Sequence, residues 1–383
     1  MKPIITVSQF FGNFPINGIQ NSKPDGYVFK IPSFITGYSL MIITLMGIFF
    51  AADINETISS TKENFFKTLF HALFFGYNFL VLLIIFCKSP RWIKLQMNWQ
   101  RVEGKLDNFS SSYQTKFRLR FKLRMISLIL CFCALIEHMY SYEHPLSHVP
   151  SAEKYFSLIG ENILKTTFGS LDGISHNSAV IVGILHSMLR TFATFTWNFC
   201  DLLIILVSIG LAERYKHLNE VVRFKISNNS TERINWRKIK KTYAIMNELV
   251  KEADNIVSPL ILLSCCMNVY LICVQTSEGI RSVMTESKIP IYFFLSLFFM
   301  IIRTIALVLS VAKINVESSH ASTIFTRCLS VFIIEVILMQ QQLSIDKVSF
   351  TAMKFFPITR KFIFTITGTI VTYGILYMQL RTI

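Results

Sequence analysis

Residues Pro290 to Ala312 read PIYFFLSLFFMIIRTIALVLSVA, an apolar stretch with one charged residue, Arg303. A helix rises about 1.5 Å per residue, so roughly 20 apolar residues cross the hydrocarbon core of a bilayer. This stretch therefore predicts a transmembrane helix. Six more stretches have the same character, and the full set in chain order is 34–52, 65–87, 126–143, 186–212, 256–277, 290–312 and 361–380.

The composition is also that of a membrane protein. Hydrophobic residues make up 52% of the 383 residues and charged residues 16%, whereas soluble domains carry about a quarter charged residues. No internal repeat and no linker rich in glycine or proline divides the chain. We therefore expect an all-α membrane protein with seven transmembrane helices, which places the two termini on opposite sides of the bilayer.

Positive charge is concentrated in two segments between the apolar stretches. Residues 88–124 and 213–251 each contain ten Lys or Arg residues, whereas 53–64 contains one and 278–289 contains two. Because Lys and Arg accumulate on the cytoplasmic side, this asymmetry predicts a cytoplasmic N-terminus and an extracellular C-terminus, the inverse of a G-protein-coupled receptor. The same bias explains the net charge of +15, so we expect a multi-pass protein of the plasma membrane and no nucleic acid as a partner.

Tryptophans accompany the basic residues at Trp92, Trp99 and Trp236. We expect them to mark helices that continue beyond the bilayer at its interface. The sequence has no phosphate-binding Gly-rich loop, no His-Glu-x-x-His motif and no Cys/His spacing typical of zinc sites. We therefore expect neither an enzyme nor a cofactor or metal.

A stripe of mostly polar residues runs along the last predicted span at steps of three or four, the spacing that puts side chains on one face of a helix. Its members are Thr365, Thr369, Thr372, Leu376 and Gln379. Such a face fits the wall of a water-filled path between subunits, with Leu376 and Leu380 as apolar constrictions. It also fits close helix–helix packing, and the stripe alone does not decide between the two.

Polar groups in the other spans are candidates for ligand contacts, because such groups usually face the interior of a helix bundle. Those nearer the outer half are Glu137, His138, Trp197, Asn198 and Gln275. A sugar presents hydroxyl groups at its edges and C–H patches on its faces, so its site needs acceptors, amides and a flat aromatic ring. Asp201 and Arg303 lie deeper, and for them we expect a structural ion pair; Asn268 is expected to bridge helices.

The end of the last span resembles the signature of insect gustatory receptors, Thr-Tyr, five mostly apolar residues, Gln and Phe. Thr372, Tyr373 and Gln379 match, and Leu380 stands at the Phe position. Six other stretches, collinear along the chain, look like the sugar-receptor branch: Phe11–Ile19, Ile136–His138, Trp197–Asp201, Ser208–Ala212, Ser258–Ser264 and Met353–Phe356. Sugar-branch members usually carry an acidic residue directly after Thr-Tyr, whereas this chain has Gly374.

The resemblance implies a sugar-gated, non-selective cation channel, a homo- or hetero-tetramer of related receptors with a central pore. The pore and gate would comprise the stripe together with Tyr373 and Leu380. The chain would then divide into a cytoplasmic segment (1–33), a six-helix ligand-binding region (34–360) and a pore-lining helix (361–383). Its partners would be a sugar, permeating cations and membrane lipid. A receptor for another tastant remains an alternative, as does a secondary transporter, although the odd number of spans and the lack of a repeat disfavour a transporter.

Overall fold

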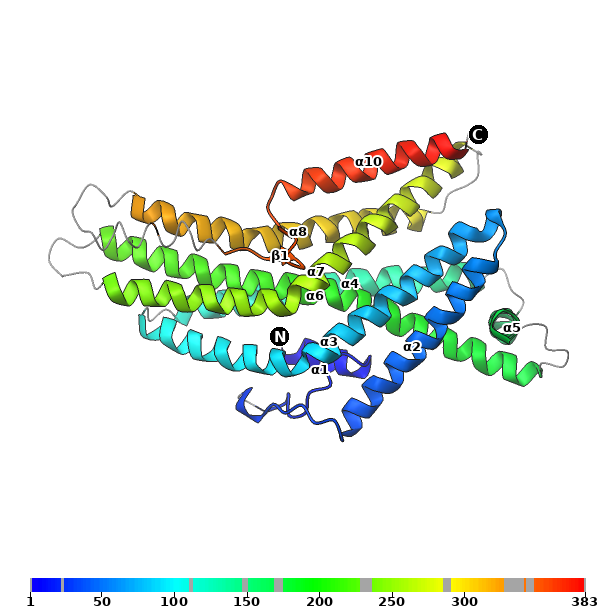
Figure 1. The fold of residues 1–383 in the computed structure, drawn as a ribbon, viewed down its shortest axis with the longest axis horizontal. Helices are drawn as coiled ribbons and strands as arrows, with labels where there is room; N and C mark the ends of the chain where they lie inside the picture. The colour runs from blue at the N-terminus through cyan, green and yellow to red at the C-terminus, as the bar shows by residue number, and fades with distance from the viewer. Residues whose placement is uncertain are drawn as a thin grey trace. The chain divides into compact units, whose positions relative to one another are not determined.

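The computed structural model describes residues 2–21, 24–109, 113–146, 151–168, 175–227, 236–284, 291–326, 341 and 348–381. Its helices are α1 (Lys2–Phe10), α2 (Phe34–Ser59), α3 (Lys62–Phe109), α4 (Tyr113–Leu146), α5 (Ala152–Phe168), α6 (His176–Ser227), α7 (Trp236–Met284), α8 (Ile291–Thr326) and α10 (Phe362–Arg381), with a short 3-10 helix at Pro24–Gly26 (Figure 1). Two short antiparallel strands, β1 (Thr351–Ala352) and β2 (Phe356–Pro357), precede α10.

Each of the seven predicted spans coincides with part of a helix, although the spans 290–312 and 361–380 start one residue before α8 and α10. Five of these helices, α2, α3, α6, α7 and α8, are long and apolar enough to cross a membrane. The apolar part of α10, Phe362–Leu376, is shorter, and the middle of α4 contains Glu137 and His138 within an otherwise apolar stretch. The predicted all-α architecture with seven helical spans is confirmed.

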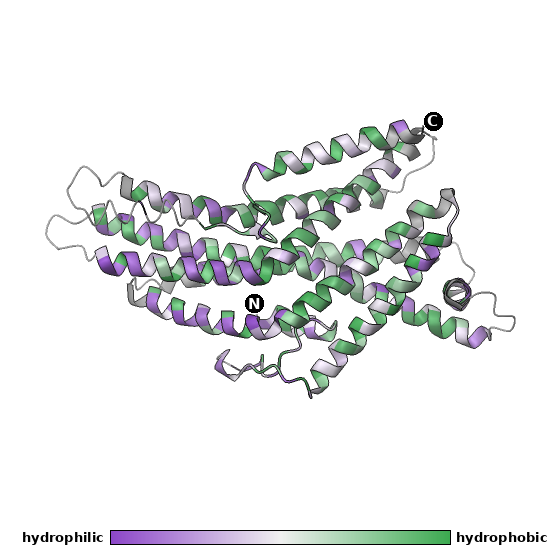
Figure 2. Cartoon of the chain, in the orientation of Figure 1, coloured by the Kyte–Doolittle hydropathy of each residue, from purple (hydrophilic) through white to green (hydrophobic). Residues whose placement is uncertain are grey.

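Three helices continue well past the apolar stretches. α3, α6 and α7 contain 48, 52 and 49 residues, about twice what a bilayer requires. Figure 2 shows hydrophilic residues concentrated toward the ends of these helices. The second basic cluster lies mostly in α6 and α7, and the first is divided between α3 and the start of α4. Most of both clusters is therefore helical, and Trp92, Trp99 and Trp236 lie in these helices, with Trp92 fully buried.

The structure also contains elements that the sequence interpretation did not predict. α5 packs against the start of α6 through two small residues: a Cβ on Gly160 would meet the Ala179 carbonyl oxygen, and one on Gly183 would meet that of Phe156. Only glycine allows so close an approach of two helix backbones. The β1–β2 hairpin before α10 was likewise not predicted.

The chain forms two compact units, residues 1–90 with 131–200 and residues 91–130 with 201–383. In the first unit the N-terminal segment packs on α6. The ring of Phe11 stacks on Phe195 with centroids 3.6 Å apart, and Asn13 Nδ2 donates to Thr196 Oγ1 at 3.3 Å. Gly12 makes this path possible, since its φ is +82° and a side chain there would collide with Ile42.

The second unit is built around α7. Helix α8 and the hairpin strand β1 contact α7, and α10 contacts both α7 and α8. The buried side chains along α7 include Leu260, Ile261 and Leu271. The helix predicted to line a pore is therefore held from one side by two long helices.

Candidate functional site

One face of α6 in the first unit combines aromatic and hydrogen-bonding groups. Its His186 ring lies 5.3 Å from Phe49 of α2 and 5.4 Å from Phe75 of α3, measured between ring centroids. Eleven residues along α6, about three turns, the buried Trp197 meets Phe74 edge to face at 6.2 Å. The sequence reasoning selected Trp197 but missed His186.

The other predicted ligand residues of this unit lie on α4 and α6 and are half-buried. Asn198 Nδ2 donates to the Thr194 carbonyl of its own helix at 2.9 Å. Glu137 and His138 are on α4. Arg190, on α6 between His186 and Trp197, places a positive charge near both His138 of α4 and His186.

Several buried polar atoms of the first unit have no hydrogen-bond partner among the described residues, and besides acceptors they include the Ser39 hydroxyl, which can donate. Asn13 Oδ1, Asp53 Oδ2 and Asn78 Oδ1 are buried without a hydrogen-bond partner among those residues, as is Nδ1 of His186. An unmet buried acceptor costs about 1–3 kcal/mol. A donor-rich molecule such as water or a polyol would satisfy these atoms.

Gln275 lies in the second unit, on α7, rather than in the unit of the other four predicted ligand residues. Its Nε2 donates to Ser296 Oγ of α8 at 3.3 Å. Its Oε1 is buried and has no partner among the described residues.

A fully buried ion pair joins α6 and α8. Arg303 Nε lies 2.9 Å from Asp201 Oδ2, and Asn268 of α7 donates to the same oxygen at 3.0 Å. Ser264 Oγ donates to the other carboxylate oxygen. The structural ion pair and the bridging role expected for Asn268 are confirmed, and both carboxylate oxygens have partners.

Helix α10 presents three different faces. Toward α7 and α8 it buries Ile366 and half-buries Ile363 and Ile370. A second face is exposed and apolar, with Phe364, Val371 and Ile375. The third is also exposed but mostly polar, and its members are Thr365, Thr369, Thr372, Leu376 and Gln379.

Two residues of the predicted pore set differ from this stripe. Tyr373 is half-buried on the side of α10 that meets α7, where Tyr270 and Cys273 are its electrostatic neighbours. Leu380 lies in α10, but its side chain is outside the described part of the structure. In the stripe, the Thr369 hydroxyl donates to the Thr365 carbonyl at 2.9 Å, so its oxygen can still accept.

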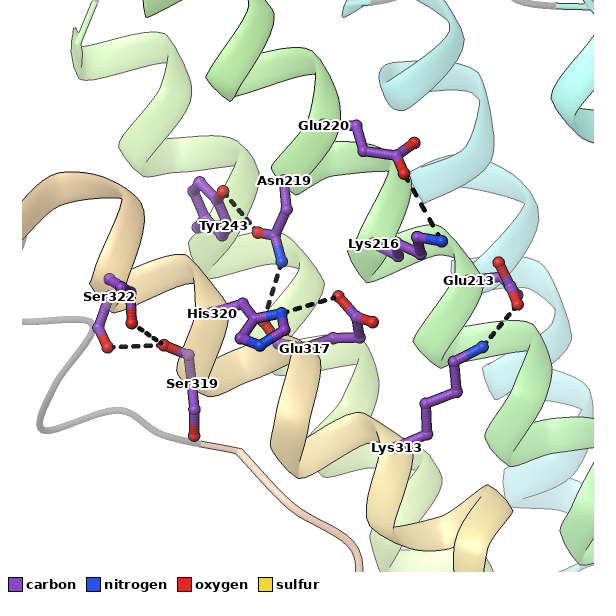
Figure 3. Close-up of polar contacts among 11 residues, drawn as sticks. Glu213, Lys216, Asn219, Glu220, Tyr243, Lys313, Glu317, Ser319, His320 and Ser322 are labelled. Atoms are coloured by element: carbon purple, nitrogen blue, oxygen red, sulfur yellow. Dashed lines mark hydrogen bonds and ion pairs between the residues drawn. The ribbon is translucent and has the colours of Figure 1, made fainter. Parts of the chain in front are cut away.

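Two cavities lie away from the predicted ligand residues. One, of about 510 Å³, is bounded by α5 and the start of α6 and includes Glu161 and His176. The other, of about 760 Å³, lies between α6 and α8 in the second unit (Figure 3). On the wall of this second cavity, Lys216 Nζ lies 3.7 Å from Glu220 Oε1, and His320 Nδ1 lies 3.9 Å from Glu317 Oε2. Charges of both signs line the second cavity, so it favours neither an anion nor a cation.

Several of these site residues could not have been found from hydropathy. Asp53 follows the predicted end of a span, Asn13 lies in a segment expected to be outside the bundle, and His186 stands at the first position of its span. The sequence feature that could have pointed to Asp53 and His186 is a polar residue at the edge of an apolar stretch. Among the described residues, no group of three or more His, Cys, Asp or Glu side chains is arranged to hold a metal ion.

These features define a class: a multi-pass membrane protein of packed helices with polar groups in its interior and one helix left with an exposed polar stripe. Its fold is similar to that of an insect olfactory receptor, OR5 from Machilis hrabei. The structure of OR5 in complex with eugenol aligns with a TM-score of 0.72 at 13% identity, over 99% of this chain and 97% of that one. A second structure of OR5 aligns with a TM-score of 0.69 at 14% identity.

The family model described as trehalose receptor matches residues 1–382. The chain therefore belongs to the trehalose receptor family. It is 27% identical to the gustatory receptor for sugar taste 64f of Drosophila melanogaster, over 98% of this chain and 79% of that protein. It is 26% identical to the gustatory receptor 5a for trehalose of the same organism, over 99% and 84%.

These relatives confirm the resemblance to sugar-branch gustatory receptors. They show that the chain is a gustatory receptor and not an enzyme.

The buried ion pair generates a stability prediction. Asp201→Ala leaves a buried guanidinium without its carboxylate and should cost about 3–5 kcal/mol, measured as a lower midpoint of thermal unfolding in detergent. Asp201→Ala combined with Arg303→Met removes both charges, so the double variant should be more stable than Asp201→Ala alone. A double variant less stable than Asp201→Ala would contradict the ion-pair assignment.

Proposed function

We propose that this receptor is a sugar-gated, non-selective cation channel, with the agonist in the outer half of the bundle and a pore formed by α10 helices of four subunits. The polar stripe of α10 is the observation that carries the proposal. In a bilayer, an exposed helix face meets lipid, another helix or water. The apolar face with Phe364 and Val371 suits lipid, whereas the threonine and glutamine face does not.

A ring of copies explains both exposed faces of α10. Rotational symmetry turns the same stripe of every subunit toward one axis, where hydroxyl and amide dipoles can replace part of the water around a cation. Leu376, in the same stripe, would form an apolar ring that closes by dewetting. Because the stripe contains no charged residue, broad selectivity among cations is expected. Leu380 and Tyr373 remain proposed members of the pore and gate.

The proposed agonist is a neutral polyol. Its hydroxyl groups would donate to the buried acceptors of the first unit, and its C–H faces would pack on Trp197. The names of the relatives, which specify sugar taste and trehalose, point to the same class. The proposed contacts in the first unit are Glu137, His138, Trp197 and Asn198, with Arg190 and His186 on the same helix as the last two. Gln275 is a further proposed contact, in the second unit. Agonist would open the channel by binding the open state more tightly.

The proposed orientation is a cytoplasmic N-terminus in the plasma membrane. It rests on the basic extensions of α3, α6 and α7, because Lys and Arg near the ends of spans remain on the cytoplasmic side.

The function is tested by recording currents from cells that express the chain, alone and with related subunits, under a panel of mono- and disaccharides that includes trehalose. A sugar should evoke a cation current far larger than an alternating-access transporter can carry.

Asn198→Ala should raise the half-maximal sugar concentration by about 5- to 100-fold, since it removes one or two buried hydrogen bonds. Phe132→Ala, on the exposed side of α4, is the control. Activation by apolar bitter compounds and by no sugar would refute the proposed ligand.

The pore assignment is tested by the same substitution on two faces of α10. Thr372→Val removes a hydroxyl from the stripe and should change unitary conductance or cation preference while the half-maximal sugar concentration stays within about twofold. Thr367→Val makes the same change on an exposed part of the helix outside the stripe, and single-channel currents should not change. Equal effects of the two variants, or none at Thr372, would remove the stripe from the pore.

The orientation is tested with epitope tags in intact cells. A tag at the N-terminus and one between residues 228 and 235 should bind antibody only after permeabilisation, and a C-terminal tag should bind without it. Staining of the N-terminal tag in intact cells would reverse the orientation.

A further inference from the structure

The segment that leads into α10 is a hairpin anchored on α7 rather than a free linker. Strands β1 and β2 pair Thr351 with Pro357, and Ile358 N donates to the Phe350 carbonyl at 2.9 Å. Phe350 and Ile358 are fully buried. The turn between the strands contains Met353 and Lys354 at φ of 50° and 65°, a left-handed conformation that non-glycine residues adopt only where surrounding contacts hold it.

The contact that holds the hairpin is made by Asp254 of α7. Its Oδ1 accepts the backbone N–H of Thr351 at 2.8 Å, and its Oδ2 accepts the Thr351 hydroxyl at 2.9 Å. The same hydroxyl oxygen accepts the backbone N–H of Lys354 at 3.1 Å, across the left-handed turn. One threonine side chain therefore closes the turn and ties it to a largely buried carboxylate.

Two weaker anchors flank this contact. The Met353 N–H donates to the Ser258 carbonyl of α7 at 3.1 Å, and Ser318 Oγ of α8 accepts the Val348 N–H at 3.0 Å. Ser258 precedes Pro259, which interrupts the hydrogen-bond ladder of α7. Thus two stretches singled out in the sequence, at 258–264 and 353–356, meet in space although about 95 residues separate them.

From this geometry we infer that Asp254 and Thr351 are a positioning pair that transmits movement of α7 to α10. The inference rests on the proposed channel function. α7 carries Gln275, a proposed ligand contact, some 20 residues beyond Asp254. Only four residues, 358–361, separate the hairpin from Phe362 at the start of α10, so the hairpin cannot shift with α7 without moving that end of α10.

The experiment compares three substitutions at two threonines. Thr351→Val keeps the side-chain volume but removes the hydroxyl, and it should raise the half-maximal trehalose concentration by roughly tenfold, the effect of about one charge-assisted hydrogen bond. Thr351→Ser restores the hydroxyl and should behave like the wild type. Thr359→Val makes the matched change in the same linker, where no side-chain hydrogen bond is present among the described residues, and should also behave like the wild type. Surface protein is quantified for each variant.

A second readout does not depend on current. In the purified full-length protein, amide hydrogen exchange in residues 348–376 should be faster in Thr351→Val than in the wild type or Thr351→Ser, with exchange along 260–280 of α7 unchanged. Asp254→Asn weakens the same contact, and it replaces Thr351→Val in both measurements if Thr351→Val does not reach the cell surface.

Three outcomes overturn the positioning role: a trehalose response of Thr351→Val equal to wild type, the same shift in Thr359→Val, or failure of serine to rescue. If the wild type passes no sugar-evoked current, the proposed function fails separately. Amide hydrogen exchange of Thr351→Val then tests the positioning pair without a current. Faster exchange than in the wild type at both 348–358 and 362–376 supports the pair, and unchanged exchange at 362–376 overturns it.

Discussion

The second unit depends on one constraint: a polar group in the bilayer must find its partner within the protein, because lipid offers none. Asp201 and Arg303 meet this constraint together, with Ser264 and Asn268 completing the shell around the carboxylate. The four side chains come from α6, α7 and α8, so satisfying one charge fixes the rotation of three helices about their axes. Apolar packing alone would leave those rotations poorly defined, since many hydrophobic arrangements have similar energies.

The proposed function rests on polar groups that do not meet this constraint within the described residues. In the second unit Asp201 and Arg303 are paired, whereas Asp53 Oδ2 and Asn78 Oδ1 in the first unit and Gln275 Oε1 in the second have no hydrogen-bond partner among the described residues. On α10 the polar stripe is exposed in the described part of the structure. Under the proposed function, a ligand would bind the first group of atoms and further copies of the chain would cover the stripe. Hydrogen bonding of buried polar groups would therefore stabilise the helix packing at Asp201 and Arg303 and serve the proposed function elsewhere.

Hydropathy was enough to predict the seven helical spans, because a bilayer requires every spanning segment to be apolar and helical. The extra length of α3, α6 and α7 was less visible, since charged helices in water have no lipid signal. α5 and the hairpin depend on tertiary contacts, Gly160 on α6 and Asp254 on Thr351, that no local pattern specifies. At the candidate site, composition pointed to Trp197 and Asn198 within a span, but the neighbouring His186 became apparent only through its contacts with Phe49 and Phe75.

The packing of the N-terminal segment on α6 has a consequence for biogenesis. Asn13 and its partner Thr196 are 183 residues apart in the chain. At a synthesis rate of about 5–20 residues per second, Asn13 would leave the ribosome roughly 10–40 s before Thr196 has been made. During that interval Phe11 and Phe14 have no α6 surface to cover them, and the first helices must insert without their final neighbour. The newly made chain therefore passes through a stage in which an aromatic segment is open to chaperones or lipid.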